Sequence, residues 1–347
     1  MGVPPVYGKR DEIGISLRRR RASVHSAGGL APHDHVGWFG DGAGELYSMA
    51  SAALADGARR GEKLMFVAED PDPARLRGVA GLERLLATGQ LELLAVDTVY
   101  GTGDAFSASA QLATFEGVLT GALADGYRGV RVVADNTPFV RGDDESFRRW
   151  LAWEQLTDRF QAASMVTGVC FFDHAALTEE RQADLAALHP VRSASIGEPP
   201  FSLFSDGDAV SVTGTVDASS GEQFRRILGT ILVDRPLVVD LSGARFVDHH
   251  ALLVLAETAS ADRPLHVRGD GLLRELVSSS GLATPYVRFE YGAAAPPRCV
   301  RCGDVIGVYE PATIVLDGEP RATSRAAEPD AVAQAPERYH RACHDNR

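Results

Sequence analysis

The sequence contains no apolar run that approaches the roughly 18–20 residues needed for a membrane-spanning helix. Its N-terminal stretch also lacks the uninterrupted apolar core of a secretory signal peptide. We therefore expect a cytoplasmic protein, in which thiols stay reduced. Cysteine is scarce, with 4 among 347 residues. The net charge of −12 disfavours a broad electrostatic grip on nucleic acid or on an anionic membrane.

The length predicts two or three domains, and a content of 45% hydrophobic and 24% charged residues is an ordinary globular balance. High usage of alanine, arginine and glycine indicates a GC-rich bacterial source. We expect a flexible arm over residues 1–32, α/β domains over 33–197 and 201–290, and a C-terminal module over 296–347 with a disordered loop at about 321–336. Four consecutive arginines at 18–21 fall in the arm, and we interpret them as a solvated segment.

In the first of these domains, short apolar segments alternate with segments of helical periodicity. The expected strands are 36–39, 63–68, 91–96, 130–135 and 164–172, and the expected helices are 45–58, 73–86, 108–125 and 143–162. The strands are apolar throughout rather than alternating. The fold class is therefore predicted as α/β, with a mostly parallel sheet flanked by helices on both faces.

A glycine-rich loop, Gly40–Gly42–Gly44, follows the first expected strand, where a nucleotide-binding fold carries its phosphate loop. A phosphate loop needs a Lys and a Ser or Thr after its last glycine, and this loop has neither. Instead, Asp41 and Glu45 place negative charge there. Asp135 ends an apolar strand, where a metal-binding carboxylate of an ATPase would lie, but it has no phosphate loop as partner. We therefore expect no enzymatic activity.

Six short segments together resemble the MEDS domain, a bacterial sensory module related to RecA/KaiC-like ATPases. They are His35 and the segments 57–62, 126–131, 153–154, 168–173 and 189–190. The resemblance implies that a small molecule or a partner is sensed. His35, Asp135 and Glu154 are candidates to line a pocket at the carboxyl edge of the sheet. The alternatives are that His35 satisfies a buried amide and that Glu154 lies on a solvated helix face, and Cys170 is expected to be an inert buried side chain.

The second domain contains a short apolar strand at 238–241, a polar turn, and Asp248 as the predicted N-cap of a helix. This pattern resembles the STAS domain of anti-sigma-factor antagonists. In that family the loop after the Asp carries a serine that a partner kinase phosphorylates, whereas this chain has His249, His250 and Ala251. The resemblance implies binding of a sigma-factor regulator or a related kinase. Asp248, His249 and His250 are the candidate partner-binding loop.

The last part of the sequence holds two close pairs of metal-ligand types, Cys299 with Cys302 and His340 with Cys343. Three thiolates and one imidazole satisfy tetrahedral Zn²⁺ and leave no open position, so the site is predicted to be structural. The arrangement resembles one zinc module of a LIM-type finger. A redox pair or an unstructured tail are the alternatives, and His344 can replace His340 in the ligand set.

Together these features predict a non-enzymatic bacterial signalling regulator in which a sensory domain acts on a partner-binding domain. The alternatives are a degenerate ATPase and a phosphotransfer protein centred on His249, where a helix N-terminus stabilises a phosphoryl group. A minor alternative is a zinc-dependent transcription regulator. An acidic chain without a dense basic helix disfavours contact with nucleic acid.

Overall fold

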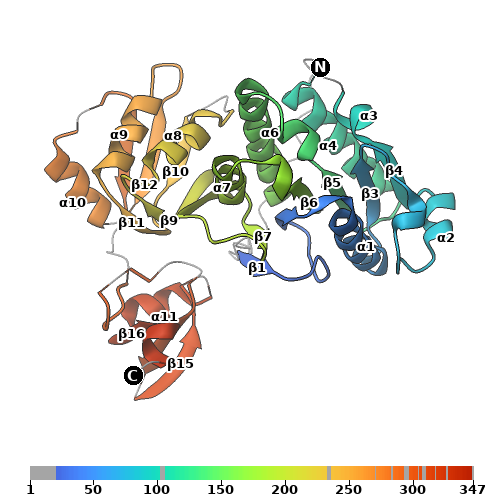
Figure 1. Cartoon of the computed structure of the whole chain (residues 1–347). Helices are drawn as coiled ribbons and strands as arrows, with labels where there is room; N and C mark the ends of the chain where they lie inside the picture. The colour runs from blue at the N-terminus through green and yellow to red at the C-terminus, as the bar shows by residue number, and fades with distance from the viewer. Residues whose placement is uncertain are drawn as a thin grey trace.

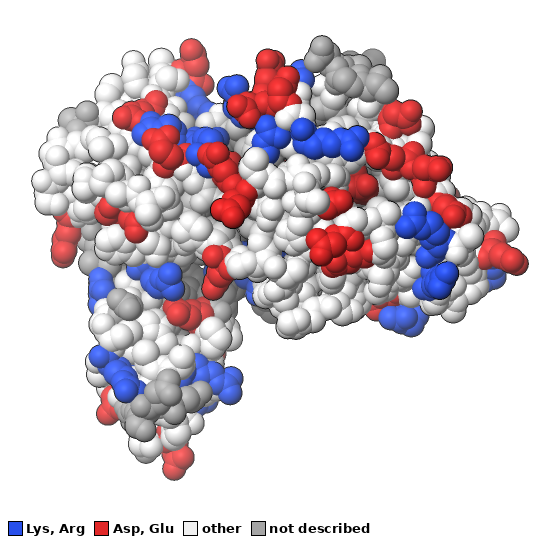
Figure 2. All heavy atoms as spheres, viewed as in Figure 1, with Lys and Arg blue, Asp and Glu red and all other residues white. Residues whose placement is uncertain are grey.

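The computed structural model of the chain describes residues 21–101, 106–232, 236–269, 271–282, 284–292, 297–303, 305–306, 310–316, 318–325 and 327–345. Most of the arm expected over residues 1–32, including three of its four consecutive arginines, lies outside this part of the chain. Within the described residues, no helix has the length and apolar character that crossing a membrane requires. On the face drawn in Figure 2, acidic and basic side chains are intermixed rather than separated into large regions of one sign.

The first α/β domain is built on a seven-stranded parallel sheet with the order β1-β7-β2-β6-β5-β3-β4 (Figure 1). Its strands are β1 (Ala22–Val24), β2 (His35–Gly40), β3 (Lys63–Ala68), β4 (Leu91–Ala95), β5 (Val130–Asp135), β6 (Val166–Asp173) and β7 (Val191–Ser193). Five of them lie where the sequence predicts strands. β1 and β7 were not expected, and β1 pairs with β7 although the sequence predicts a flexible arm there. Leu30, which follows β1, is fully buried and anchors this segment.

Helices cover both faces of this sheet. They are α1 (Gly42–Arg60), α2 (Leu82–Ala87), α3 (Val96–Tyr100), α4 (Ala108–Ala124), α5 (Thr137–Val140), α6 (Asp144–Ala163) and α7 (Glu179–Leu188). Consecutive residues of β6, Phe171 and Phe172, belong to two different hydrophobic clusters, one under α1 and one under α6. The helix expected over 73–86 is only a 3₁₀ turn followed by α2. Gly78 and Gly81 between them adopt positive φ, which ends regular helix.

The second α/β domain has a mixed sheet with the order β11-β9-β10-β12-β13, and β8 pairs antiparallel with β9. The strands are β8 (Phe201–Asp206), β9 (Ala209–Val216), β10 (Leu237–Asp240), β11 (Ala244–Val247), β12 (Leu265–Gly269) and β13 (Val287–Tyr291), and the helices are α8 (Gly221–Gly229), α9 (His249–Thr258) and α10 (Gly271–Ser280). Ala251, Leu252, Val254 and Leu255 form the buried side of α9. Leu253 of the same helix is 42% exposed.

The two α/β domains pack directly against each other through α6 and α7, which both contact β8 (Figure 1). The side-chain amide of Gln155 in α6 donates to the carbonyl oxygen of Ile227 in α8 at 2.9 Å. Arg226 of α8 donates two hydrogen bonds, of 3.0 and 3.1 Å, to the carboxylate of Asp184 in α7. One continuous hydrophobic cluster includes residues of both domains. Helix α6 is thus shared between the sheet of the first domain and the edge of the second.

The C-terminal module has its own three-stranded antiparallel sheet in the order β15-β14-β16. Its elements are β14 (Ala312–Leu316), β15 (Glu319–Thr323), α11 (Pro329–Gln334), β16 (Glu337–His340) and α12 (Arg341–Asp345). The structure differs here from the disordered loop expected at 321–336. Val332 and Ala335 are buried in the small core of this module, so the alanine-rich stretch contributes helical packing rather than a free loop.

Candidate functional site

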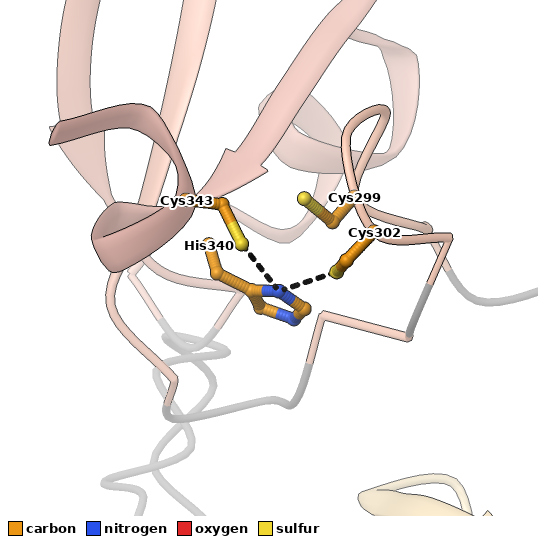
Figure 3. A group of neighbouring side chains, drawn as sticks. All are labelled: Cys299, Cys302, His340 and Cys343. Carbon is orange, nitrogen blue, oxygen red and sulfur yellow. Dashed lines mark hydrogen bonds between the residues drawn. The ribbon is translucent and has the colours of Figure 1, made fainter. Parts of the chain in front are cut away.

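The C-terminal module brings Cys299, Cys302, His340 and Cys343 into one cluster, and Figure 3 shows the two halves of the cluster facing each other. One ligand atom from each residue lies within 4.8 Å of all the others. The Sγ atoms of Cys302 and Cys343 lie 3.3 and 3.9 Å from His340 Nδ1. Ligands around tetrahedral Zn²⁺ are about 3.8 Å apart when the Zn–S distance is about 2.3 Å. The four side chains therefore could hold a metal ion after small adjustments.

Local backbone geometry explains this cluster. Gly303 adopts a φ of 79°, and its amide donates to the carbonyl oxygen of Cys299 at 2.9 Å, so the chain turns tightly around the two cysteines. The amide of Val300 donates to the carbonyl oxygen of Arg338, which fixes the turn against β16. His340 ends β16 and Cys343 lies one helical turn later in α12. His344, the alternative ligand, instead has its ring 5.7 Å from that of Tyr339.

Hydrogen bonds from surrounding groups place His340 and Cys299 in states that favour binding of a cation. His340 Nε2 lies 3.2 Å from the carbonyl oxygen of Val305, so a proton on Nε2 leaves the Nδ1 lone pair facing the cysteines. Burial raises the pKa of Cys299, but hydrogen bonds from the backbone amides of Cys302, His340 and Arg301 lower it overall to about 7. A thiolate is therefore accessible near neutral pH, and thiolates are the form that binds zinc.

A second cluster lies inside the first α/β domain and consists of His35, Glu154, Cys170 and His189, all buried. We call it the buried quartet. Glu154 Oε2 lies 3.2 Å from His35 Nε2 and 3.4 Å from His189 Nε2, and Cys170 Sγ lies 3.5 Å from His35 Nε2. The residues come from β2, α6, β6 and the segment between α7 and β7. One ligand atom from each again lies within 4.8 Å of the others.

Electrostatics link the members of the buried quartet. Burial alone would raise the pKa of Glu154, but the contacts with His189 and His35 lower it to about 2. Burial by itself lowers the pKa of His35, yet Cys170, Asp158 and Glu154 together raise it well above 6.5. Burial and the charge of Glu154 raise the pKa of Cys170 to about 11. Without a metal ion, the charge of Glu154 therefore favours a protonated His35 and a neutral Cys170 thiol.

Sequence reasoning identified only part of the buried quartet. His35 and Glu154 were candidates, whereas Cys170 was expected to be inert and His189 was not singled out as a site residue. Glu154 is fully buried, so it does not lie on a solvated helix face. Asp135 is not in the quartet and accepts a hydrogen bond from the backbone amide of Thr137 at 3.1 Å. His35 begins β2, so the quartet lies away from the carboxyl edge where a pocket was expected.

At the glycine-rich loop, a carboxylate of the protein takes the place where an anion would bind. Glu45 Oε2 accepts from the backbone amide of Asp41 at 3.0 Å, and its Oε1 accepts from Trp38 Nε1 at 2.9 Å. A Cβ added at Gly40 would come within 2.5 Å of the Glu45 carboxyl carbon, so only glycine admits this arrangement. The start of α1 is thus already supplied with negative charge.

The candidate partner-binding loop lies at the start of α9. Asp248 is the N-cap, and its Oδ1 accepts from the backbone amide of His250 at 2.8 Å while its Oδ2 lies 3.0 Å from His250 Nδ1. The rings of His249 and His250 are in contact, with centroids 4.0 Å apart, and His249 is exposed. Phe246 and Leu253 nearby in the sequence are 53% and 42% exposed. Aromatic, apolar and imidazole groups are therefore all exposed around this loop.

Comparison with known proteins connects the first domain to a family. Residues 34–190 match the MEDS family. The family is described as the methanogen/methylotroph, DcmR sensory domain, and the matched range includes the whole buried quartet. We therefore refer to the first α/β domain as the sensory domain, and this match, which spans less than half of the chain, indicates a signalling role.

Comparison with solved structures found the flagellar accessory protein FlaH from Methanocaldococcus jannaschii. The match has 9% identity and a TM-score of 0.31, and it covers 52% of this chain and 76% of that one. We draw no functional argument from so distant a likeness. The search of curated proteins found no match.

Proposed function

We propose that this protein is a non-enzymatic bacterial signalling regulator in which the sensory domain controls a STAS-like second domain. The second domain binds a sigma-factor regulator or a related kinase-like protein. A signal detected in the sensory domain changes the availability of the surface around Asp248, His249 and His250. The MEDS match supports the sensing role.

The observation that carries this proposal is the dual contact of α6. On one side, Glu154 of α6 joins the buried quartet. On the other side, Asp158 of the same helix accepts a 2.6 Å hydrogen bond from the backbone amide of Ser205 in β8. Asp158 also lies 3.1 Å from His35 Nδ1. A change at the quartet is therefore transmitted to the second domain by a single side chain rather than by a flexible linker.

The composition of the loop at α9 supports regulation by binding rather than by serine phosphorylation. Residues 248–251 offer no hydroxyl to a kinase. Phe246 and Leu253 provide exposed apolar surface that a partner protein can cover. Glu45, which fills the anion position at α1, supports the absence of nucleotide hydrolysis in the sensory domain.

Binding to a sigma-factor regulator is tested with full-length protein as bait in the native host, followed by mass spectrometry and then by a binding measurement on the purified partner. Leu253→Asp, at the loop surface, should weaken binding at least about tenfold, since it places a charge in an apolar contact. Leu123→Asp is the matched control, because Leu123 is a 46% exposed leucine in α4 of the sensory domain. Equal affinity of the wild type and Leu253→Asp would contradict the proposed surface.

Phosphotransfer remains the alternative that the exposed His249 favours, because it lies at the N-terminus of a helix. Incubation with an anti-sigma-type kinase and ATP should leave residues 248–251 unlabelled. An acid-labile phosphate on His249 would contradict the binding-only proposal and support phosphotransfer instead.

We further propose that Cys299, Cys302, His340 and Cys343 hold a structural Zn²⁺. The core of this module consists of few buried side chains, and modules of this size usually need a metal or disulfides for stability. Cys302→Ser should reduce the zinc content of protein purified without chelator by one equivalent per chain, measured by plasma mass spectrometry. His344→Gln is the control and should retain that zinc, because His344 is not part of the cluster. Identical zinc content in wild type and Cys302→Ser would refute the site.

A further inference from the structure

The buried quartet combines the donor atoms of a transition-metal site. Its four side chains offer two imidazole nitrogens, a thiol sulfur and a carboxylate oxygen. Mixed nitrogen and sulfur donors select zinc and neighbouring transition metals, whereas Mg²⁺ and Ca²⁺ prefer oxygen ligands. All four side chains are buried, so a bound ion would be shielded from water.

The two histidines are oriented as metal ligands are. His189 Nδ1 lies 2.7 Å from the carbonyl oxygen of Leu185, which can only accept, so Nδ1 carries the proton and Nε2 faces the quartet. His189 Nε2 makes no hydrogen bond of acceptable geometry, although Glu154 Oε2 is 3.4 Å away. His35 Nδ1 is likewise held by Asp158, which turns its Nε2 toward the quartet. A histidine whose outer nitrogen bonds a carbonyl or a carboxylate is the usual second-layer arrangement around protein-bound metals.

The backbone is shaped to fit His189. A Cβ added at Gly37 of β2 would lie 2.8 Å from His189 Cγ, so the ring packs directly on the glycine. Next to Cys170 is a cavity of about 30 Å³, which Asn136 and Trp153 also line. This volume admits about one water-sized molecule beside Cys170, and the other three members of the quartet do not line the cavity.

We propose that His35, Cys170 and His189, together with Glu154, bind a divalent transition-metal ion of the zinc and cobalt class inside the sensory domain. On binding, the metal forms bonds to Cys170 sulfur and to His35 Nε2. The S–H bond of Cys170 and the Nε2–H bond of the protonated His35 break, and both protons are released to solvent. The site itself stands on the geometry of the four side chains. Its role as the sensed ligand rests on the proposed signalling function.

Metal binding at this site would change a hydrogen bond with the second domain. When a metal replaces the proton on Nε2 of the protonated His35, the Nδ1–H becomes a weaker donor to Asp158 Oδ1, which leaves more negative charge on that carboxylate. The other oxygen of the same carboxylate accepts from the Ser205 amide in β8. The path from the metal to β8 therefore contains only His35 and Asp158, both buried.

The distribution of cysteines allows a direct test on the full-length chain. Replacing Cys299, Cys302 and Cys343 together by Ser removes the C-terminal site and leaves Cys170 as the sole cysteine of the protein. Titration of this variant with Co²⁺ should produce a sulfur-to-cobalt charge-transfer absorption that saturates at one Co²⁺ per chain. Only Cys170 can be its source. Absence of the absorption from protein with an intact circular-dichroism spectrum would overturn the proposal.

Two further substitutions in this single-cysteine variant distinguish a metal ligand from a neighbouring residue that is not a ligand. His189→Gln should weaken Co²⁺ binding at least about tenfold, in the range seen when residues around a metal site are changed. Thr167→Val, a change of similar shape on the same strand β6, should leave Co²⁺ affinity unchanged. Equal affinity in all three proteins would refute the assignment of His189 as a ligand.

Transmission is measured separately, so that the two proposals can fail independently. Hydrogen–deuterium exchange at the Ser205 amide should slow when Co²⁺ binds, and Asp158→Asn should abolish this change. A cobalt–sulfur absorption without any change in exchange in the second domain would preserve the metal site and refute its signalling role. Loss of both signals would refute the site itself.

Discussion

Asp158 provides a quantitative test of the contact between the two α/β domains. Its side chain lies 3.1 Å from His35 Nδ1 and accepts from the Ser205 amide at 2.6 Å, and the residue is only 2% exposed. Asp158→Ala leaves two buried N–H groups without this acceptor, and each such group costs about 1–3 kcal/mol. We therefore expect the free energy of unfolding to fall by about 2–6 kcal/mol. Asp158→Asn keeps one acceptor oxygen, so its free energy of unfolding should fall by about half as much.

Urea unfolding followed by two probes checks this expectation. All three tryptophans, Trp38, Trp150 and Trp153, lie in the sensory domain, so fluorescence reports that domain while circular dichroism reports the whole chain. Both midpoints should move to lower urea in Asp158→Ala. Glu145→Ala, an exposed carboxylate on the same helix, is the control and should change stability by no more than about 0.5 kcal/mol. A loss below about 1 kcal/mol in Asp158→Ala would refute the reasoning, because buried unsatisfied groups cost more.

Three further changes test other parts of the structure. Gly37→Ala should destabilise the sensory domain by about 1–3 kcal/mol in urea unfolding, because the new methyl group meets the buried ring of His189 at 2.8 Å. Burial alone would raise the pKa of Asp56, but Arg60 and Arg131 lower it overall, so this carboxylate stabilises the fold above pH 3.8 and loses that effect as pH falls through its lowered pKa. Asp56→Asn should therefore cost about 1 kcal/mol near neutral pH and progressively less in acid, as measured by thermal melts across pH. Asp248→Ala should cost about 1 kcal/mol by removing the cap of α9, and an unchanged melting temperature would contradict the capping role.

Strands that are buried on both faces were predictable from the sequence, since their apolar residues run together and helices separate them. β2, β3, β4, β5 and β6 all lie where this pattern places them. β1 and β7 have three residues each, too few to show a period, and they form because they pair with each other in the tertiary structure. The composition of the arm did not indicate β1, because the local strand propensity of a segment carries no information about a partner strand that is distant in the sequence.

The two metal-ligand clusters also differ in how far the sequence alone predicts them. In the C-terminal module, each ligand pair is close in sequence, so the spacing itself indicates a shared ion. In the buried quartet, His35 and His189 lie near opposite ends of the sequence of the sensory domain. Cys170 stands alone in an apolar strand. Nothing in the local sequence distinguishes such a cysteine from an ordinary core residue. Strand pairing in the folded domain brings these groups together: β2 pairs with β6, which places Gly37 opposite Cys170, and also with β7, which follows His189.

Helix α6 explains why a polar quartet and a domain interface occur in the same protein. Its residues Glu154 and Asp158 are four apart and so lie on the same side of the helix, one turn from each other. Both carboxylates contact His35, at 3.2 and 3.1 Å, and only Asp158 reaches on to β8. Burying two carboxylates costs free energy that an apolar helix would avoid. Asp158 therefore joins the quartet directly to the contact with β8, through one carboxylate oxygen on each side.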